Sequence, residues 1–214
     1  MKVSELPTVI IIYRGLPTPD VLAATEALLE VGLSAFEVTL DSPEPLKAIG
    51  AMIQHFGNDV AVGAGTVRRV RDVESAAHAG ASFLLSPHLD QEIVAATKAA
   101  GLISIPGAYT PTEVCHAWEA GADMVKVFPL QPAGPQYIRY LLEPLRDIRL
   151  LASGGVSADI GRACLDAGCA TLGVGAGLLD RQAVTLQDWK ALQVAGTRFL
   201  ARLTGEVVST TVAL

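Results

Sequence analysis

The stretch Asp123-Met124-Val125-Lys126-Val127-Phe128-Pro129 places a lysine in the middle of a short apolar run. A short apolar run bounded by turn residues is typical of a strand buried within a parallel sheet. Burial disfavours the charged form of an amine, so a lysine at this position of a buried strand needs a physical explanation. Either its side chain extends past the strand end to water or to a carboxylate, or its amine serves as a nucleophile.

A glycine junction directly before this strand recurs along the chain. Ala120-Gly121-Ala122 matches Ala79-Gly80-Ala81 and Ala167-Gly168-Cys169, each between a helical pattern and an apolar run. Glycine adopts the left-handed conformation that ends a helix. The chain therefore repeats a unit of strand, helix and glycine turn.

Eight such strands are expected, with the strand around Lys126 as the sixth. The other seven are 9–13, 35–40, 60–64, 83–85, 102–105, 148–152 and 170–174. Helices are expected between them, and we expect Thr18 to cap the first helix and Asp90 the fourth. Since about two dozen residues per unit leave room only for short loops, the pattern predicts an α/β fold, a single (β/α)8 TIM barrel. A doubly wound open sheet is the alternative, but no Gly-x-Gly-x-x-Gly follows the first strand.

A length of 214 residues fits one barrel domain over residues 1–214. Its C-terminal part, residues 185–204, is expected to contain a helix from Gln187 to Leu203, followed by a tail at 205–214. Half of the residues are apolar and 18% are charged, which predicts apolar surface buried between subunits of a homo-oligomer.

The net charge limits the classes of partner that the protein is expected to bind, and the cysteine spacing indicates the compartment in which it is expected. A net charge of −6 argues against nucleic acid, because no basic field neutralises phosphates. No apolar run approaches the ~18 residues of a membrane span, and the start lacks the apolar core of a signal peptide. The three cysteines show no Cys-x-x-Cys spacing, so we expect neither disulfides nor a zinc site, and a cytoplasmic location.

Three chemically distinct side chains stand at or near the ends of predicted strands: Arg14, Glu37 and Lys126. In a parallel barrel the chemistry lies at the carboxyl ends of the strands. Glu37 interrupts an apolar strand, where the pKa of an unpaired carboxyl rises. The residues alone allow a Glu37–Lys126 ion pair that only stabilises the interior, or a base beside a nucleophilic amine.

Six stretches in the same order carry a resemblance to a known family. They are Phe36 to Leu40, Val62 to Val67, Ser86-Pro87, Ile105 to Gly107, Val125 to Pro129 and Gly154 to Val156. Over residues 8 to about 180, the chain resembles the class I 2-keto-3-deoxy-6-phosphogluconate and 2-keto-3-deoxy-6-phosphogalactonate aldolases. Tyr13-Arg14-Gly15 and residues 134–138 resemble the galactonate branch.

The resemblance implies a retro-aldol reaction on a phosphorylated keto sugar acid, yielding pyruvate and glyceraldehyde 3-phosphate. Lys126 would form a Schiff base with the C2 ketone, and Glu37 would move the protons. It implies no metal and no other cofactor, because the iminium polarises the bond that breaks. Trimers are common in this family, so a homotrimer is expected.

The resemblance also implies the residues that bind the substrate. Arg14 and Thr66 would hold the carboxylate, although Arg14 also fits a surface arginine at a strand end. The pocket wall would come from Pro87, Pro106 and Phe128, which equally suit loop stiffening and core filling.

The far end of the substrate would meet the last two strands. Ser153, Gly154, Gly155, Gly175 and Ala176 lie at the phosphate corner of such a barrel. The family commonly has serine where Ala176 stands, so an aldolase for an unphosphorylated acid such as 4-hydroxy-2-oxoglutarate stays open. Another phosphate-binding barrel enzyme, an isomerase or a synthase, and a catalytically silent barrel acting through its oligomer surface also remain.

Overall fold

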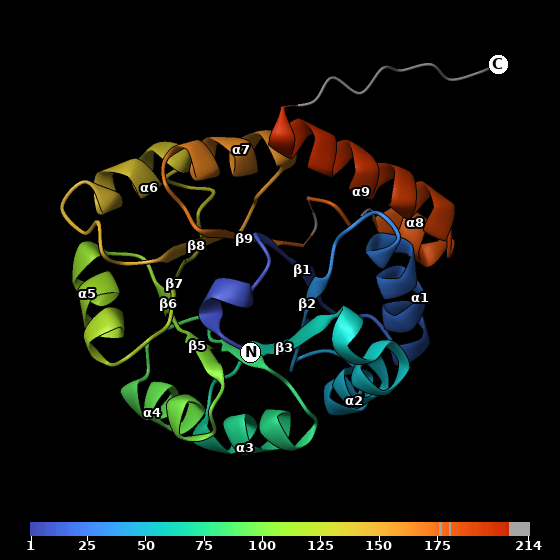
Figure 1. Ribbon diagram of the computed structural model, residues 1–214, viewed down its shortest axis with the longest axis horizontal. Helices are drawn as coiled ribbons and strands as arrows, with labels where there is room; N and C mark the ends of the chain where they lie inside the picture. The colour runs from blue at the N-terminus through green and yellow to red at the C-terminus, as the bar shows by residue number, and fades with distance from the viewer. Residues whose placement is uncertain (176, 180, 206–214) are drawn as a thin grey trace.

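The structure, a computed structural model, describes residues 1–175, 177–179 and 181–205. Within them, nine parallel strands form one sheet in the order β5-β4-β3-β2-β1-β9-β8-β7-β6. Because β5 and β6 follow each other in the chain, the sheet closes on itself into a barrel (Figure 1). The strands are β1 (Val9–Tyr13), β2 (Ala35–Thr39), β3 (Ala61–Gly65), β4 (Phe83–Leu85), β5 (Ile103–Ile105), β6 (Gly107–Ala108), β7 (Val125–Val127), β8 (Leu150–Ser153) and β9 (Thr171–Val174).

Pro106 follows the predicted fifth strand, 102–105, and separates β5 from the short strand β6, which was not predicted. A proline has no N–H to donate to a ladder, but its carbonyl accepts a hydrogen bond from the Lys126 N–H at 2.8 Å. The piece before Pro106 pairs with β4 and the piece after it pairs with β7. The predicted (β/α)8 barrel is therefore confirmed, with β5 and β6 together at the position of its fifth strand.

A ring of helices covers the outside of the barrel (Figure 1). The C-terminal helix α9 packs against α1 and α7 and closes the ring between them. The five-residue helix α8 was not predicted from the sequence. The helices are α1 (Thr18–Leu29), α2 (Pro45–Phe56), α3 (Val70–His78), α4 (Gln91–Ala99), α5 (Pro111–Glu119), α6 (Pro135–Leu142), α7 (Ala158–Asp166), α8 (Arg181–Thr185) and α9 (Trp189–Thr204), with a 3-10 turn η2 (Gly57–Asp59).

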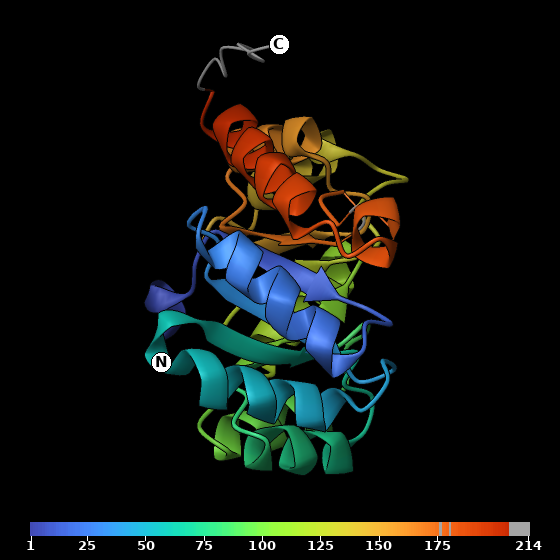
Figure 2. The ribbon, with the colours of Figure 1, turned by 90° about the vertical axis from the view of Figure 1, so that its right-hand side faces the viewer.

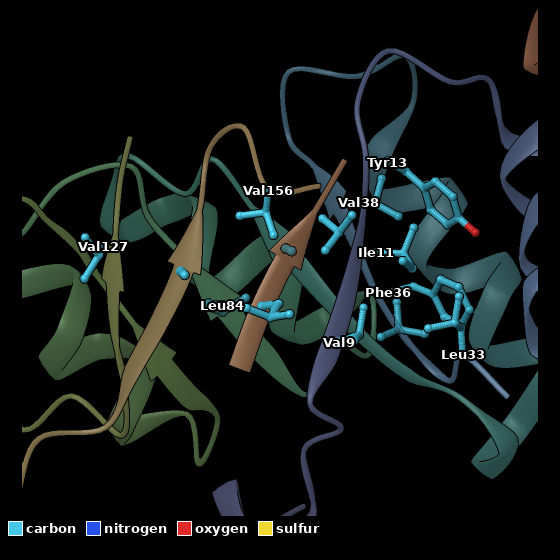
Figure 3. Close-up of a cluster of buried hydrophobic side chains, with 14 of the residues drawn as sticks. Val9, Ile11, Tyr13, Leu33, Phe36, Val38, Leu84, Val127 and Val156 are labelled. Atoms are coloured by element: carbon cyan, nitrogen blue, oxygen red, sulfur yellow. The ribbon is translucent and has the colours of Figure 1, made fainter. Parts of the chain in front are cut away.

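Alternation along the strands produces two apolar cores. On β1, Val9, Ile11 and Tyr13 face outward and pack with Phe36 under the helices (Figure 3). Ile10 faces inward and belongs to a second cluster inside the barrel, with Phe83, Leu85, Ile105 and Leu151 among its members. A strand covered on both faces has no polar side, which explains the continuous apolar runs in the sequence.

A short 3-10 helix, η1 (Val3–Glu5), covers the end of the barrel where the strands begin (Figures 1 and 2). Val3 and Leu6 pack against the interior cluster. Figure 2 shows α8 at the opposite end. The barrel is thus closed at one end, and the functional cavity lies at the carboxyl ends of the strands.

The glycine junctions have the expected geometry, whereas one predicted helix cap is wrong. Gly80, Gly121 and Gly168 have φ values of +95°, +94° and +100°, as the left-handed helix end requires. The Asp90 carboxylate accepts hydrogen bonds from two N–H groups at the start of α4, so that cap is confirmed. Thr18 does not cap α1, because the helix already begins there and Pro17 occupies the cap position.

The predicted tail at 205–214 lies outside the described residues, except for Gly205. None of the helices in the described ranges is both long and apolar enough to cross a membrane.

Candidate active site

Glu37 and Lys126 both point into the barrel because of strand alternation. On β2, Phe36 and Val38 belong to the outer core, so Glu37 between them faces inward. On β7, Val125 and Val127 likewise face outward, and Lys126 faces inward. Since β1, β9 and β8 lie between β2 and β7 in the sheet, the two side chains enter the interior from well-separated walls.

Lys126 is buried rather than extended into bulk solvent. Its relative exposure is 6%, and its Nζ lies 4.9 Å from the centroid of the Phe128 ring. It forms no ion pair with a carboxylate in the described part of the chain. The amine therefore lies over an aromatic face, in the geometry of a cation–π contact.

Glu37 is 1% exposed, and burial raises the pKa of its carboxyl group. The charges of Lys126 and Arg14 lower this pKa in part, and the charge of Asp41 raises it. Among the described residues, no group forms a hydrogen bond with the buried Oε2 of Glu37. A carboxyl group with a raised pKa and a free oxygen is suited to accept and return protons.

A cluster of polar groups joins the ends of three strands at the mouth of the barrel. Arg14 donates from Nη1 to the Asp41 carboxylate and from Nη2 to Thr66 Oγ1, the latter over 3.1 Å. The Gly15 N–H donates to Ser42 Oγ at 2.8 Å. The β1–α1 loop is thereby attached to the β2–α2 turn, and the guanidinium group is fixed beside Thr66.

A cavity of about 690 Å³ opens at this end of the barrel. It brings together nine of the residues expected to form the site, and Lys126 and Arg14 are the cations among the lining residues that the structure describes. The nine are Arg14, Thr66, Pro87, Lys126, Phe128, Ser153, Gly154, Gly155 and Gly175.

Two expected site residues are not among the described residues that line this cavity, and a third lies outside the described residues. Glu37 lies within the barrel interior, near enough to Lys126 for its pKa to respond to the lysine charge. Pro106 is buried between β5 and β6, where its carbonyl receives the Lys126 N–H. Ala176 lies outside the described residues.

Other lining residues were not singled out from the sequence. Leu16, Leu179 and Val184 add apolar side chains to the lining, and Thr185 adds a hydroxyl. Val184 and Thr185 belong to α8, a helix too short to leave a periodic pattern in the sequence. In the described ranges, no three His, Cys, Asp or Glu residues come together as a metal-binding group.

Comparison with known proteins finds similarity over most of the chain. Residues 1–195 match the family model described as "KDPG and KHG aldolase". The chain is 36% identical over 176 residues to the 2-dehydro-3-deoxy-6-phosphogalactonate aldolase of Escherichia coli strain K12. The aligned region covers 82% of this chain and 85% of the relative.

Two solved structures extend the comparison to the fold. The structure titled "Native KDPGal structure" matches with a TM-score of 0.85 and 32% identity, over 96% of this chain and all of that one. A KDPG aldolase from Legionella pneumophila, with pyruvate captured as a covalent carbinolamine intermediate, matches with a TM-score of 0.83 and 25% identity. That match covers 90% of this chain and 93% of the other.

Proposed function

Because the chain belongs to the KDPG and KHG aldolase family, and is therefore a carbon–carbon lyase, we propose that it cleaves 2-keto-3-deoxy-6-phosphogalactonate through a Schiff base on Lys126. The products are pyruvate and glyceraldehyde 3-phosphate. One observation carries this proposal: in the described part of the chain, the one buried amine and the one buried carboxyl group, whose pKa is raised, share the interior of the barrel beside the cavity.

The reaction begins with the Lys126 amine. Its unprotonated form attacks the C2 ketone to form a carbinolamine, and loss of water gives a protonated Schiff base. The electrons of the C3–C4 bond then flow into the iminium, which releases the aldehyde and leaves an enamine. Protonation at C3 and hydrolysis of the imine return pyruvate and the free amine. Phe128 supports this sequence, because its ring faces the nitrogen that carries the positive charge.

Glu37 moves the protons in these steps. It accepts the C4 hydroxyl proton as the C3–C4 bond breaks and delivers a proton to the enamine. A base works best when its pKa is near the operating pH, and burial raises the pKa of Glu37 in that direction. The unpartnered Oε2 is available for the transfer.

Arg14 and Thr66 hold the carboxylate of the substrate. Arg14 keeps donors beyond those given to Asp41 and Thr66, because a guanidinium group carries five N–H bonds. Pro87 and Phe128 form the wall beside the amine. This arrangement puts the carboxylate next to the ketone carbon that Lys126 attacks.

The far end of the substrate lies at the corner formed by Ser153, Gly154, Gly155 and Gly175. Unshielded backbone at the ends of the last two strands is a common phosphate site in barrels. Ala176 lacks the serine hydroxyl, and Leu16 and Leu179 add apolar side chains to the cavity lining. These features favour a second candidate substrate, the unphosphorylated 4-hydroxy-2-oxoglutarate.

Pyruvate release from three acids tests the substrate. The acids are 2-keto-3-deoxy-6-phosphogalactonate, its phosphogluconate epimer and 4-hydroxy-2-oxoglutarate. The phosphogalactonate is expected to give the highest kcat/KM. Ala176→Ser is expected to raise kcat/KM about two- to tenfold for the phosphorylated acids, since a hydroxyl adds a hydrogen bond of about 0.5–1.5 kcal/mol. A higher kcat/KM for another acid contradicts the choice of substrate, and no pyruvate from any acid contradicts the activity.

We also propose that the protein is a homotrimer. Its apolar content is high, and large apolar side chains such as Tyr140, Leu186 and Val194 are exposed on the single chain. Light scattering coupled to gel filtration is expected to give three times the chain mass. The mass of one chain at micromolar concentration contradicts the proposal.

A further inference from the structure

The inner face of β3 consists of residues with little or no side chain. Val62 and Ala64 belong to the outer core, so Ala61, Gly63 and Gly65 face the barrel interior. The space above this face is filled from the neighbouring strands. The Phe83 ring of β4 covers Gly63, and the Glu37 side chain of β2 covers Gly65.

Glu37 occupies the volume that a side chain at position 65 would take. A Cβ on Gly65 would lie 1.5 Å from Glu37 Oε1, 2.3 Å from Cδ and 2.7 Å from Cγ. In the β2–β3 ladder, Glu37 pairs with Gly63 and Thr39 pairs with Gly65. The Glu37 side chain therefore leans along the barrel toward the carboxyl ends of the strands, where Lys126 and Arg14 lie.

No hydrogen bond in the described ranges fixes the Glu37 carboxyl group, and its Oε2 is fully buried without a partner. Its position is thus set by the shape of its surroundings and by nearby charges. We propose that Gly65 is a positioning residue. Because it has no side chain, it leaves the space in which the Glu37 carboxyl group lies, and this space is called the seat below. The catalytic part of this inference rests on the proposed function, whereas the steric part does not.

A seat of this kind suits a base that must both take and give protons. A hydrogen-bond donor to the carboxylate would favour its ionised form and oppose the return of the proton. Contact with the Gly65 Cα holds the group without that penalty. Thr66 follows directly, with φ +58°, and accepts the hydrogen bond from Arg14. The dipeptide Gly65-Thr66 therefore supports the base and the carboxylate-binding arginine together.

Gly65→Ala displaces the carboxyl group. Since non-bonded heavy atoms separate by about 3.5–4.0 Å, Glu37 Oε1 must move by about 2 Å. A displacement of about 1 Å in a reacting group can lower a rate about 100-fold. We expect Gly65→Ala to lower kcat at least about 100-fold with KM changed less than about threefold. The reduced pyruvate adduct on Lys126 should still form to completion, because the amine is untouched.

A double-mutant cycle in unfolding tests the seat independently of activity. Gly65→Ala should lower the urea midpoint strongly in the wild-type background and much less in the Glu37→Ala background, where the overlapping carboxyl group is gone. Gly63→Ala is the matched control, because the atoms nearest to its Cβ would be those of the Phe83 ring, at 2.1 Å, and not those of the Glu37 carboxyl group. Its effect should be the same in both backgrounds.

The outcomes separate the two parts of the inference. If Gly65→Ala does not fold, the Glu37→Ala/Gly65→Ala double variant still decides, because the seat predicts that it folds like Glu37→Ala. An equal loss of stability in both backgrounds overturns the seat. If Glu37→Ala restores the urea midpoint but kcat of Gly65→Ala is unchanged, the seat stands, and the catalytic part of the inference and the role of Glu37 as base are both overturned. The Lys126 adduct then remains as the separate test of the proposed function.

Discussion

The Arg14 guanidinium forms an ion pair with the Asp41 carboxylate at the mouth of the barrel. The two residues are 27 positions apart and follow the neighbouring strands β1 and β2. Both side chains are about half exposed, at 56% and 49%. An exposed pair of this kind adds little to folding stability, so we expect its main effect on the substrate carboxylate that Arg14 is proposed to bind.

Asp41→Asn is expected to lower KM for the keto acid several-fold, with kcat within about twofold. Asparagine keeps an acceptor for the guanidinium but removes a negative charge that opposes a second carboxylate, an effect of about 1 kcal/mol for solvated charges about 4 Å apart. The gain should shrink at high salt. Asp41→Ala is the matched variant, because it removes the charge and the acceptor together. A similar rise of KM in both variants would contradict this account.

Glu37→Gln is expected to raise the melting temperature near neutral pH. Burial outweighs the attraction of Lys126 and Arg14, so the pKa of Glu37 is raised from its ordinary value of 4.5. The folded chain then binds the proton more tightly than the unfolded chain, and stability falls as pH rises from 4.5 through the raised pKa. A rise of one pH unit in that pKa corresponds to about 1.4 kcal/mol.

The advantage of Glu37→Gln should disappear when the pH is lowered below 4.5, where Glu37 is protonated in both states. Glu113→Gln is the control of opposite sign. Backbone N–H groups of Thr110 and Tyr109 lower the pKa of Glu113, so that carboxylate stabilises the fold above 4.5 and loses this effect as the pH falls. Thermal melts of both variants across this range check the signs, and a destabilised Glu37→Gln at neutral pH contradicts the argument.

Thr18→Val is expected to stabilise the protein by about 1 kcal/mol. Thr18 Oγ1 is buried without a hydrogen-bond partner among the described residues, and an unsatisfied buried hydroxyl is unfavourable by about 1–3 kcal/mol. Thr110→Val is the matched control, since its hydroxyl accepts from the Glu113 N–H at 3.3 Å. That variant should lose about 1 kcal/mol. Urea unfolding that shows a loss of stability in Thr18→Val would mean that the hydroxyl is satisfied after all.

The barrel could be predicted because its strands leave local signals. Runs such as Val9 to Tyr13 are apolar on both faces, and each glycine junction marks the end of a helix. Lys126 and Glu37 were conspicuous because each interrupts such a run with a charge. Alternation then determines that both side chains face the interior.

Other features depend on contacts between distant positions. The Glu37 contact with Gly65 arises from the register of two strands and the lean of one side chain, so no local pattern reveals it. Helix α8 has only five residues, fewer than a periodic signal needs. The cap of α1 was misplaced by one residue because Thr18 is a common capping residue type, whereas Pro17 occupies the cap position without a side-chain hydrogen bond.

Borohydride trapping with pyruvate tests the central claim most directly. The protein is incubated with pyruvate, reduced, and analysed by intact-mass and peptide mass spectrometry. The account predicts one reduced pyruvate adduct per chain, located on Lys126, and no adduct in Lys126→Met. No adduct in the wild-type protein, or an adduct on a different lysine, would contradict it.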